Sequence, residues 1–190
     1  MGASDISMGI EVEKKFRLTP EQLRLLAEVL PRCGAIREGR EFEENTLYRH
    51  PAIDTQTAVL RVRRVGERTI LTFKQQIPTS TAAKYRREEE TEVADYAALA
   101  TILGVLGCVP GLVYEKWRET WRLRGAEIVI DELPFGWFME IEGSEEVITE
   151  VEELIAIKGL EVESSTYPQL SWKHGNRLGD IVEARFGSAR

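Results

Sequence analysis

Polar and hydrophobic residues alternate along several segments of the chain, which is the pattern of strands with one apolar face. In one of them, Arg61 and Arg63 alternate with Leu60 and Val62. The alternating segments cover about 9–18, 35–49, 57–65, 68–76, 84–93, 111–123, 126–132 and 136–142. Turn sequences containing glycine or proline separate several of them. The pattern therefore predicts eight or so strands.

Helix signals lie between and after these strands. Thr19 is a typical N-cap, Pro20 fits the first helical position, and Gln22 completes a capping box, so a helix is expected to run to about Pro31. Further helices are expected from Asp95 to Leu106, from Ser144 to about Lys158 and, with a break at Gly175, from Ser164 to about Phe186.

This order of elements predicts an α+β fold dominated by an antiparallel sheet or barrel. The length of 190 residues suits a single domain, 1–190, with residues 164–190 as a C-terminal helical segment. Hydrophobic residues make up 43% of the chain, which is enough for a sizeable core.

The net charge of the chain limits the classes of partner that it is expected to bind. A formal net charge of -7 argues against broad binding of nucleic acid or of anionic membranes. The chain has neither an apolar signal segment near its start nor a run of about 18 apolar residues. We therefore expect a cytoplasmic protein without a membrane anchor, and nothing excludes a homodimer.

Like charges recur two residues apart on the expected strands. Such pairs share one strand face at a spacing of about 7 Å, which is unfavourable unless opposite charge lies between them. The carboxylate pairs are Glu11 with Glu13, Glu88 with Glu90 and Glu140 with Glu142, and the base pairs are Arg61 with Arg63 and Lys116 with Arg118.

A divalent cation relieves a carboxylate pair, and a polyanion relieves a pair of bases. Mg²⁺ typically takes one or two carboxylates and completes its shell with water and substrate phosphates. Arginine matches phosphate oxygens with two parallel donors, and lysine adds a point charge. Together the pairs predict a site for metal-bound polyphosphate, although a sheet with one solvated, charged face remains the ordinary alternative.

Other site types are disfavoured by what the sequence lacks. It has no G-x-x-x-x-G-K-[ST] motif, which argues against a P-loop. It has only two histidines, His50 and His174, which argues against a Ser-His-Asp triad and against a histidine-rich zinc site.

The segment IEVEKKF resembles the E-x-E-x-K signature of the CYTH superfamily, also called triphosphate tunnel metalloenzymes. That superfamily includes class IV adenylyl cyclases, thiamine triphosphatases and inorganic triphosphatases. LRVR, LTFK, R-x-E-x-E, K-x-R, a lone Asp and E-I-E follow in the family's order. The resemblance extends from Glu11 to about Tyr167.

The resemblance implies an eight-stranded antiparallel β-barrel, or tunnel, with a charged interior and with helices packed outside. It implies Mg²⁺ or Mn²⁺ as cofactor, and a catalytic Lys15 that activates the attacking water. The implied phosphate-binding residues are Lys15, Arg61, Arg63, Lys74, Arg86, Lys116 and Arg118. The implied metal ligands are Glu11, Glu13, Glu140 and Glu142, and the further tunnel acids are Glu88, Glu90 and Asp131.

One position departs from the family pattern. The family often has an N-x-Y/F-F-D-T-P-like segment before the L-R-x-R strand, and here Arg49 stands where Asp is expected. Asp54 is a candidate substitute. The departure concerns substrate choice more than fold.

The preferred function is metal-dependent hydrolysis of a triphosphate, either inorganic tripolyphosphate or a small organic triphosphate such as ATP or thiamine triphosphate. A class IV-type adenylyl cyclase would hold ATP in the same tunnel and release cyclic AMP and pyrophosphate. A third hypothesis is a non-enzymatic sensor of polyphosphate or nucleotide, and a fourth is a purely structural domain.

Overall fold

The computed structural model describes residues 12–77 and 85–187, apart from the side chains of residues 76, 77 and 85–87. Glu11 and residues 78–84 therefore lie outside the described residues. The helices are α1 (Pro20–Arg32), α2 (Tyr96–Val105), α3 (Glu145–Ile155) and α4 (Tyr167–His174). The strands are β1 (Glu13–Leu18), β2 (Ile36–Arg49), β3 (Ala58–Val65), β4 (Arg68–Ile77), β5 (Tyr85–Val93), β6 (Val109–Leu123), β7 (Ala126–Leu133), β8 (Gly136–Glu142), β9 (Glu161–Val162), β10 (Asn176–Leu178) and β11 (Ile181–Ala184).

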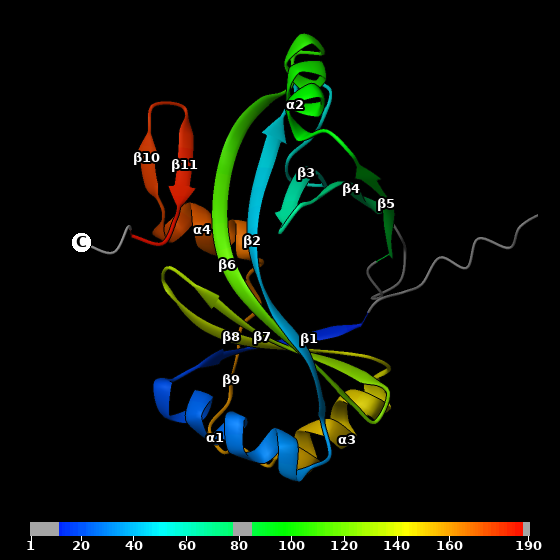
Figure 1. Ribbon diagram of the computed structural model, residues 1–190, viewed down its shortest axis with the longest axis vertical. Coiled ribbons are helices and arrows are strands. Elements are labelled where there is room, and N and C mark those ends of the chain that lie inside the picture. The colour runs from blue at the N-terminus through cyan, green and yellow to red at the C-terminus, as the bar shows by residue number, and fades with distance from the viewer. Residues whose placement is uncertain (1–11, 78–84, 188–190) are drawn as a thin grey trace, which may run out of the picture.

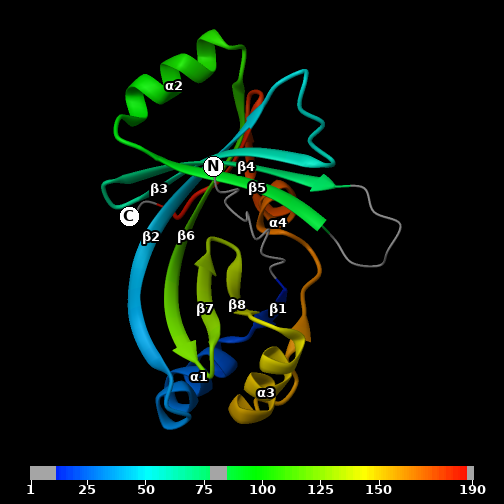
Figure 2. The same cartoon turned by 90° about the vertical axis from the view of Figure 1, so that its right-hand side faces the viewer.

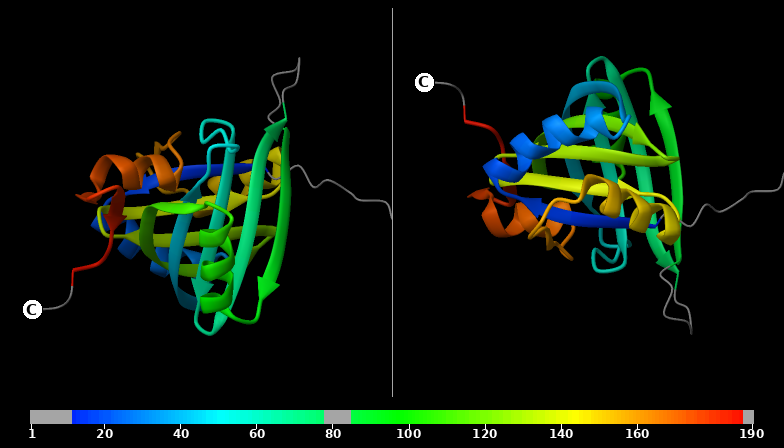
Figure 3. Two further views of the ribbon diagram at one scale, coloured as in Figure 1. Left: turned by 90° about the horizontal axis from the view of Figure 1, so that it is seen from above. Right: turned by 90° about the horizontal axis from the view of Figure 1, so that it is seen from below.

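The strands form one curved sheet in the order β5-β4-β3-β2-β6-β7-β8-β1-β9, in which all neighbours are antiparallel. Seen from above and below, the sheet wraps around an interior (Figure 3). Within the described residues, hydrogen bonds do not join β5 to β1 or β9. The expected α+β fold is confirmed, and the expected barrel takes the form of a strongly curved sheet without hydrogen-bonded closure.

The long pair β2 and β6 connects the two halves of this sheet. Their register runs from Ile36 opposite Arg122 to Arg49 opposite Val109, with an irregularity beside Gly39. Both strands bend along their length, so that β3–β5 flank one end and β7, β8 and β1 flank the other (Figures 1 and 2). Residues far apart in the sequence thereby face a common space.

Helices α1 and α3 cover the outer face of β1, β6, β7 and β8 (Figure 1). Leu26 and Leu30 of α1, with Val151 of α3, pack there against strand residues such as Phe16 and Ile141. The predicted N-terminus of α1 is confirmed: Thr19 accepts from the Gln22 amide, and the Gln22 side chain accepts from the Thr19 amide.

Helix α2 covers the outer face of the other half. Its Leu99 and Leu103 pack against Tyr48 and Val62, which alternate along β2 and β3 with the residues of the inner face. The apolar faces of the strands thus point outward and are covered by helices, as the resemblance implied.

Helix α4 packs differently, because Tyr167 and Leu170 contact Tyr114 and Phe138 on the inner side of the sheet. The sequence predicted helix as far as about Phe186, and beyond α4 this prediction was wrong. The helix ends at Gly175, and β10 and β11 form a hairpin with Gly179 at a φ of 62° in its turn. β11 pairs in parallel with β6, and this strand pairing, not a local helix signal, determines the conformation of β11.

In the part of the chain that the structure describes, none of the helices is both long and apolar enough to cross a membrane.

Candidate active site

The inner face of the sheet brings together charged residues from β1, β2, β6, β7 and β8. Directly opposed residues of neighbouring strands share a face. In this register Glu43 lies opposite Lys116, and Lys15 opposite Glu140. These side chains are largely buried, so the alternative of a solvated, charged face does not hold for this half of the sheet.

Asp131 is the centre of this group and is fully buried. Arg118, directly opposite it on β6, donates from Nε at 2.8 Å and from Nη2 at 2.6 Å. Lys116 donates from Nζ at 3.3 Å. A buried carboxylate thus satisfies two bases whose own charges would otherwise repel each other.

Glu140 links this group to β1. It accepts from Arg118 Nη2 at 2.9 Å and lies 3.2 Å from Lys15 Nζ. Lys15 also donates to the Ser165 carbonyl oxygen at 3.1 Å. The neighbouring Lys14, on the outer face, pairs instead with Glu152 of α3 at 2.7 Å, which explains a lysine among apolar positions.

Sequence reasoning missed Glu43, which is 4% exposed. Its carboxylate lies 3.4 Å from Lys116 Nζ and 3.9 Å from Arg118 Nε. The signal was present, because Glu41 and Glu43 form one more E-x-E pair in the segment that became β2. We add Glu43 to the candidate site.

Burial and charge shift the pKa values of this group. Burial lowers the pKa of Lys116, and the charge of Arg118 lowers it further. Burial alone would raise the pKa of Asp131, but the charges of Lys116 and Arg118 hold it well below its usual range. Burial would likewise raise the pKa of Glu43, but the charges of Lys116 and Arg118 outweigh it, so this pKa is also lowered. The two carboxylates therefore remain ionised at neutral pH.

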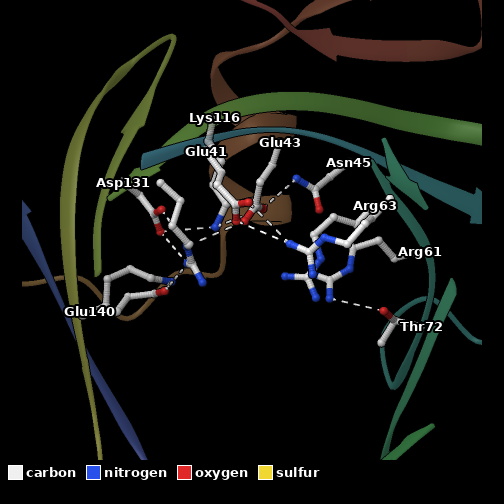
Figure 4. A network of polar contacts seen from close by, with 12 residues as sticks. Glu41, Glu43, Asn45, Arg61, Arg63, Thr72, Lys116, Asp131 and Glu140 are labelled. Atoms are coloured by element: carbon white, nitrogen blue, oxygen red, sulfur yellow. Dashed lines mark hydrogen bonds and ion pairs between the residues drawn. The ribbon is translucent and has the colours of Figure 1, made fainter. Parts of the chain in front are cut away.

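A second group of charges lies on β3, β4 and β5 and is more open to solvent. Arg61 donates from Nη2 to the Thr72 hydroxyl at 3.4 Å, and Arg63 pairs with Glu90 at 3.2 Å. Lys74 pairs with Glu88 at 2.8 Å. Figure 4 shows Arg61 and Arg63 extending from β3 toward the space that Glu43, Lys116 and Asp131 also face.

The predicted metal ligands are only partly assembled. Glu13 and Glu142 lie directly opposite each other on β1 and β8, whereas Glu140 is engaged by Lys15 and Arg118. Glu11 and the side chain of Arg86 lie outside the described residues. Within the described part of the chain, no group of three or more His, Cys, Asp or Glu residues is placed to hold a metal ion.

The pair Glu13 and Glu142 nevertheless fits a divalent cation of the magnesium type. Mg²⁺ commonly takes one or two protein carboxylates and leaves its other positions to water and phosphate oxygens. These two residues therefore provide a donor set of the expected kind.

Arg49, the departure from the family pattern, turns to the C-terminal hairpin. It donates to the Asp180 carbonyl oxygen at 2.9 Å and lies across Gly111, where an added Cβ would be 2.6 Å from Arg49 Nε. Asp54 is exposed and accepts from the Gln56 amide and the Thr57 hydroxyl within its own turn. Neither residue belongs to the buried group described above.

A family model for the CYTH domain matches residues 9–168, which include every candidate site residue. The chain belongs to the CYTH domain family. No curated protein matches the chain significantly in sequence. The CYTH model ends one residue beyond Tyr167, so β10 and β11 follow the matched region.

Solved structures agree with this assignment of the fold. A conserved hypothetical protein from Pyrococcus furiosus is 24% identical, with a TM-score of 0.68 over 84% of this chain and 99% of the other. The PH1819 protein from Pyrococcus horikoshii is 25% identical, with a TM-score of 0.67 over 86% and 98%. A candidate adenylyl cyclase from Hippeastrum, described as having a dominant triphosphatase activity, is 19% identical, with a TM-score of 0.63 over 84% and 94%.

Proposed function

We propose that this CYTH protein hydrolyses a triphosphate, inorganic tripolyphosphate or a small organic triphosphate, in a reaction that depends on Mg²⁺ or Mn²⁺. The observation that carries the proposal is the meeting of bases from β1, β3, β4 and β6 with carboxylates from β1, β2, β7 and β8 on one inner face. Such an arrangement suits a ligand that carries several negative charges together with a cation.

The bases would act at two depths. Arg61, Arg63 and Lys74 are half-buried and form the more accessible set, which suits first contact with phosphate oxygens. Lys15, Lys116 and Arg118 are held in place by buried carboxylates, so they are oriented before the ligand arrives. Preorganised charge of this kind stabilises the charge that develops during phosphoryl transfer.

Glu13 and Glu142 would hold the metal ion, together with Glu11 and with Glu140 where its base partners release it. A bound divalent ion of this kind polarises phosphate oxygens and neutralises developing charge. Lys15 lies two residues beyond Glu13 on the same strand face, where its ammonium would help to position and activate the attacking water.

Adenylyl cyclase is the second candidate, because several proteins of similar fold carry that description. They include a candidate adenylate cyclase from Vibrio parahaemolyticus, 19% identical with a TM-score of 0.64 over 85% of this chain and 97% of the other. The Hippeastrum protein, by contrast, is described by a dominant triphosphatase activity. The two reactions share the phosphate contacts and differ in their products.

The deciding experiment incubates the purified protein with tripolyphosphate, ATP or thiamine triphosphate, each with Mg²⁺ or Mn²⁺. Phosphate, pyrophosphate and cyclic AMP are quantified. Phosphate release from one substrate, lost on Glu13→Gln and retained on Lys14→Met, would support the triphosphatase. Cyclic AMP with pyrophosphate would move the assignment to a cyclase. Binding without any product would favour a sensor. If the protein neither bound nor converted any of these substrates, both enzymatic proposals would be contradicted.

A further inference from the structure

Tyr167, the first residue of α4, lies among the lysines of the inner face and is 6% exposed. The Nζ of Lys15 lies 4.2 Å from the centroid of its ring, and the Nζ of Lys116 lies 5.0 Å from it. One aromatic ring thus contacts two ammonium groups that come from strands β1 and β6. Cations near a ring face are attracted by its quadrupole, most strongly where water is excluded.

The segment before α4 is fastened to β1 at the same place. The Ser165 carbonyl accepts from Lys15 Nζ, and the Glu163 amide donates to the Lys15 carbonyl at 2.9 Å. The Glu163 carboxylate accepts from Arg17 at 3.0 Å and from the Ser165 amide at 2.8 Å. These bonds fix where α4 begins and therefore where the Tyr167 ring lies.

The hydroxyl of Tyr167 lies near the Asp131 carboxylate. It is buried and has no hydrogen-bond partner of acceptable geometry among the described residues. Burial, and then the charges of Asp131 and Glu140, raise the pKa of Tyr167 well above its usual range, so the phenol stays neutral. A neutral ring keeps the electron-rich face that attracts ammonium groups.

We propose that Tyr167 is a positioning residue, whose ring holds the Lys15 and Lys116 ammonium groups in the orientation that meets a triphosphate. That this ligand is a triphosphate rests on the proposed function. Carboxylates already neutralise both lysines, through Glu140 for Lys15 and through Glu43 and Asp131 for Lys116. The ring orients the two ammonium groups without adding negative charge, and further negative charge would repel a polyanion.

The simpler explanation is that Tyr167 only fills space. Its ring does meet Phe138 edge to face at 5.6 Å, within an apolar cluster that includes Leu112 and Leu170. A residue that only packs would be replaced well by any side chain of similar volume. A residue that holds cations requires an electron-rich ring.

The first test needs no substrate. The full chain has seven lysines, so their side-chain methylene signals can be resolved and assigned by NMR. We expect ring-current shifts at the Lys15 and Lys116 methylenes next to Nζ, retained in Tyr167→Phe and lost in Tyr167→Leu. Absence of these shifts in the wild-type protein would overturn the proposal.

The second test measures affinity for tripolyphosphate by calorimetry in the same variants. Tyr167→Phe should bind like the wild type, and Tyr167→Leu should bind roughly tenfold more weakly, in line with a desolvated cation–π contact. Phenylalanines with increasing numbers of ring fluorines at position 167 keep the packing and weaken the ring quadrupole. Affinity should fall stepwise along that series, and a constant affinity would overturn the proposal even if the leucine variant fails to fold.

The two proposals fail in different ways. If the wild-type protein does not bind tripolyphosphate, the proposed function is contradicted, and the NMR shifts still decide whether the ring holds the lysines. If the wild type binds and hydrolyses tripolyphosphate but the fluorinated variants match it, the function stands and the role of Tyr167 is wrong.

Discussion

Lys15 and Glu140 lie opposite each other on β1 and β8, with Lys15 Nζ 3.2 Å from Glu140 Oε1. The adjacent Lys14 points to the other side of the strand and pairs with Glu152 of α3. Two neighbouring lysines, each with a carboxylate partner, therefore differ mainly in the face that they occupy. This provides a matched pair of variants.

We expect Lys15→Met to reduce triphosphate hydrolysis at least about a hundredfold, the scale of a lost acid–base or electrostatic contribution. Lys14→Met should retain nearly full activity and lose less than about 1 kcal/mol of stability, because its ion pair is partly exposed. Initial rates and chemical unfolding of both variants provide the comparison. Equal losses of activity would argue against a role for the inner face.

Replacing Asp131 by Asn should strongly destabilise the fold. The change leaves Arg118 and Lys116 without their shared, fully buried counter-charge. Removing one partner of a buried ion pair typically costs about 3–5 kcal/mol. The adjacent Glu132 is partly exposed and pairs with Arg40, so Glu132→Gln should cost less than about 1 kcal/mol. Urea unfolding at neutral pH measures both, and a small loss in Asp131→Asn would contradict the network.

The same carboxylate predicts a pH dependence of stability. The folded-state pKa of Asp131 lies below its unfolded value, so its contribution is fully present above about pH 4 and declines as pH falls through the folded-state pKa. Glu43 shifts in the same direction. We expect the urea midpoint of the wild type to fall on acidification below about pH 4, and that of Asp131→Asn to fall less. Parallel curves would indicate that other carboxylates dominate.

The proposed metal site makes Glu13→Gln informative in two conditions. Without metal, the change should leave the free energy of unfolding within about 0.5 kcal/mol of the wild type, because Glu13 is exposed. With tripolyphosphate present, the affinity for Mn²⁺ should drop by roughly tenfold or more, on the scale seen when metal sites lose supporting groups. Calorimetry with Glu21→Gln, an exposed change on α1, is the control. Unchanged Mn²⁺ affinity in Glu13→Gln would exclude this residue as a ligand.

Arg61 should contribute directly to phosphate affinity. Its guanidinium donates to the neutral Thr72 hydroxyl and extends into the space shared with Lys116 (Figure 4). We expect Arg61→Gln to weaken tripolyphosphate binding roughly ten- to a hundredfold, the scale of a lost charged hydrogen bond. Arg61→Lys should retain only part of the wild-type affinity for tripolyphosphate, because lysine lacks the two parallel donors of arginine.

Arg64 provides the control for this measurement. It follows Arg63 on β3, points to the outer face, and pairs with Glu44 at 3.1 Å. Arg64→Gln should therefore leave tripolyphosphate affinity within about twofold, in keeping with a charge outside the site. If the two variants lost affinity equally, the effect would reflect net charge and not a specific contact.

Local signals in the sequence determined most of the elements. The cap and capping box at Thr19 and Gln22 specified the start of α1, and the alternation in 57–65 specified β3 and its two faces. Period-two alternation also separated the charged side chains from the apolar ones, since successive residues of a strand point to opposite faces. The like-charge pairs on one face then suggested ligands of opposite sign.

The C-terminal stretch after Gly175 shows where local signals were insufficient. Its conformation depends on pairing between β11 and β6, whose residues are about 70 positions apart in the sequence, and no local pattern specifies a partner at that distance. The same reason applies to Tyr167, which has an ordinary local context, so that only the neighbours brought by other strands show what it contacts. Glu43 differs, because its E-x-E pair with Glu41 was a local signal and only its partners came from the fold.

The sequence by itself therefore determined which residues are charged on which strand face, and it led to the prediction of a polyanion with a cation as their ligand. The tertiary structure decided which face is buried, because the curvature of β2 and β6 and the covering helices turn the charged face inward. It also decided the partners, setting Asp131 between Lys116 and Arg118 and Tyr167 beside two lysines. Such contacts depend on strand register and on the packing of α4, which are properties of the whole fold.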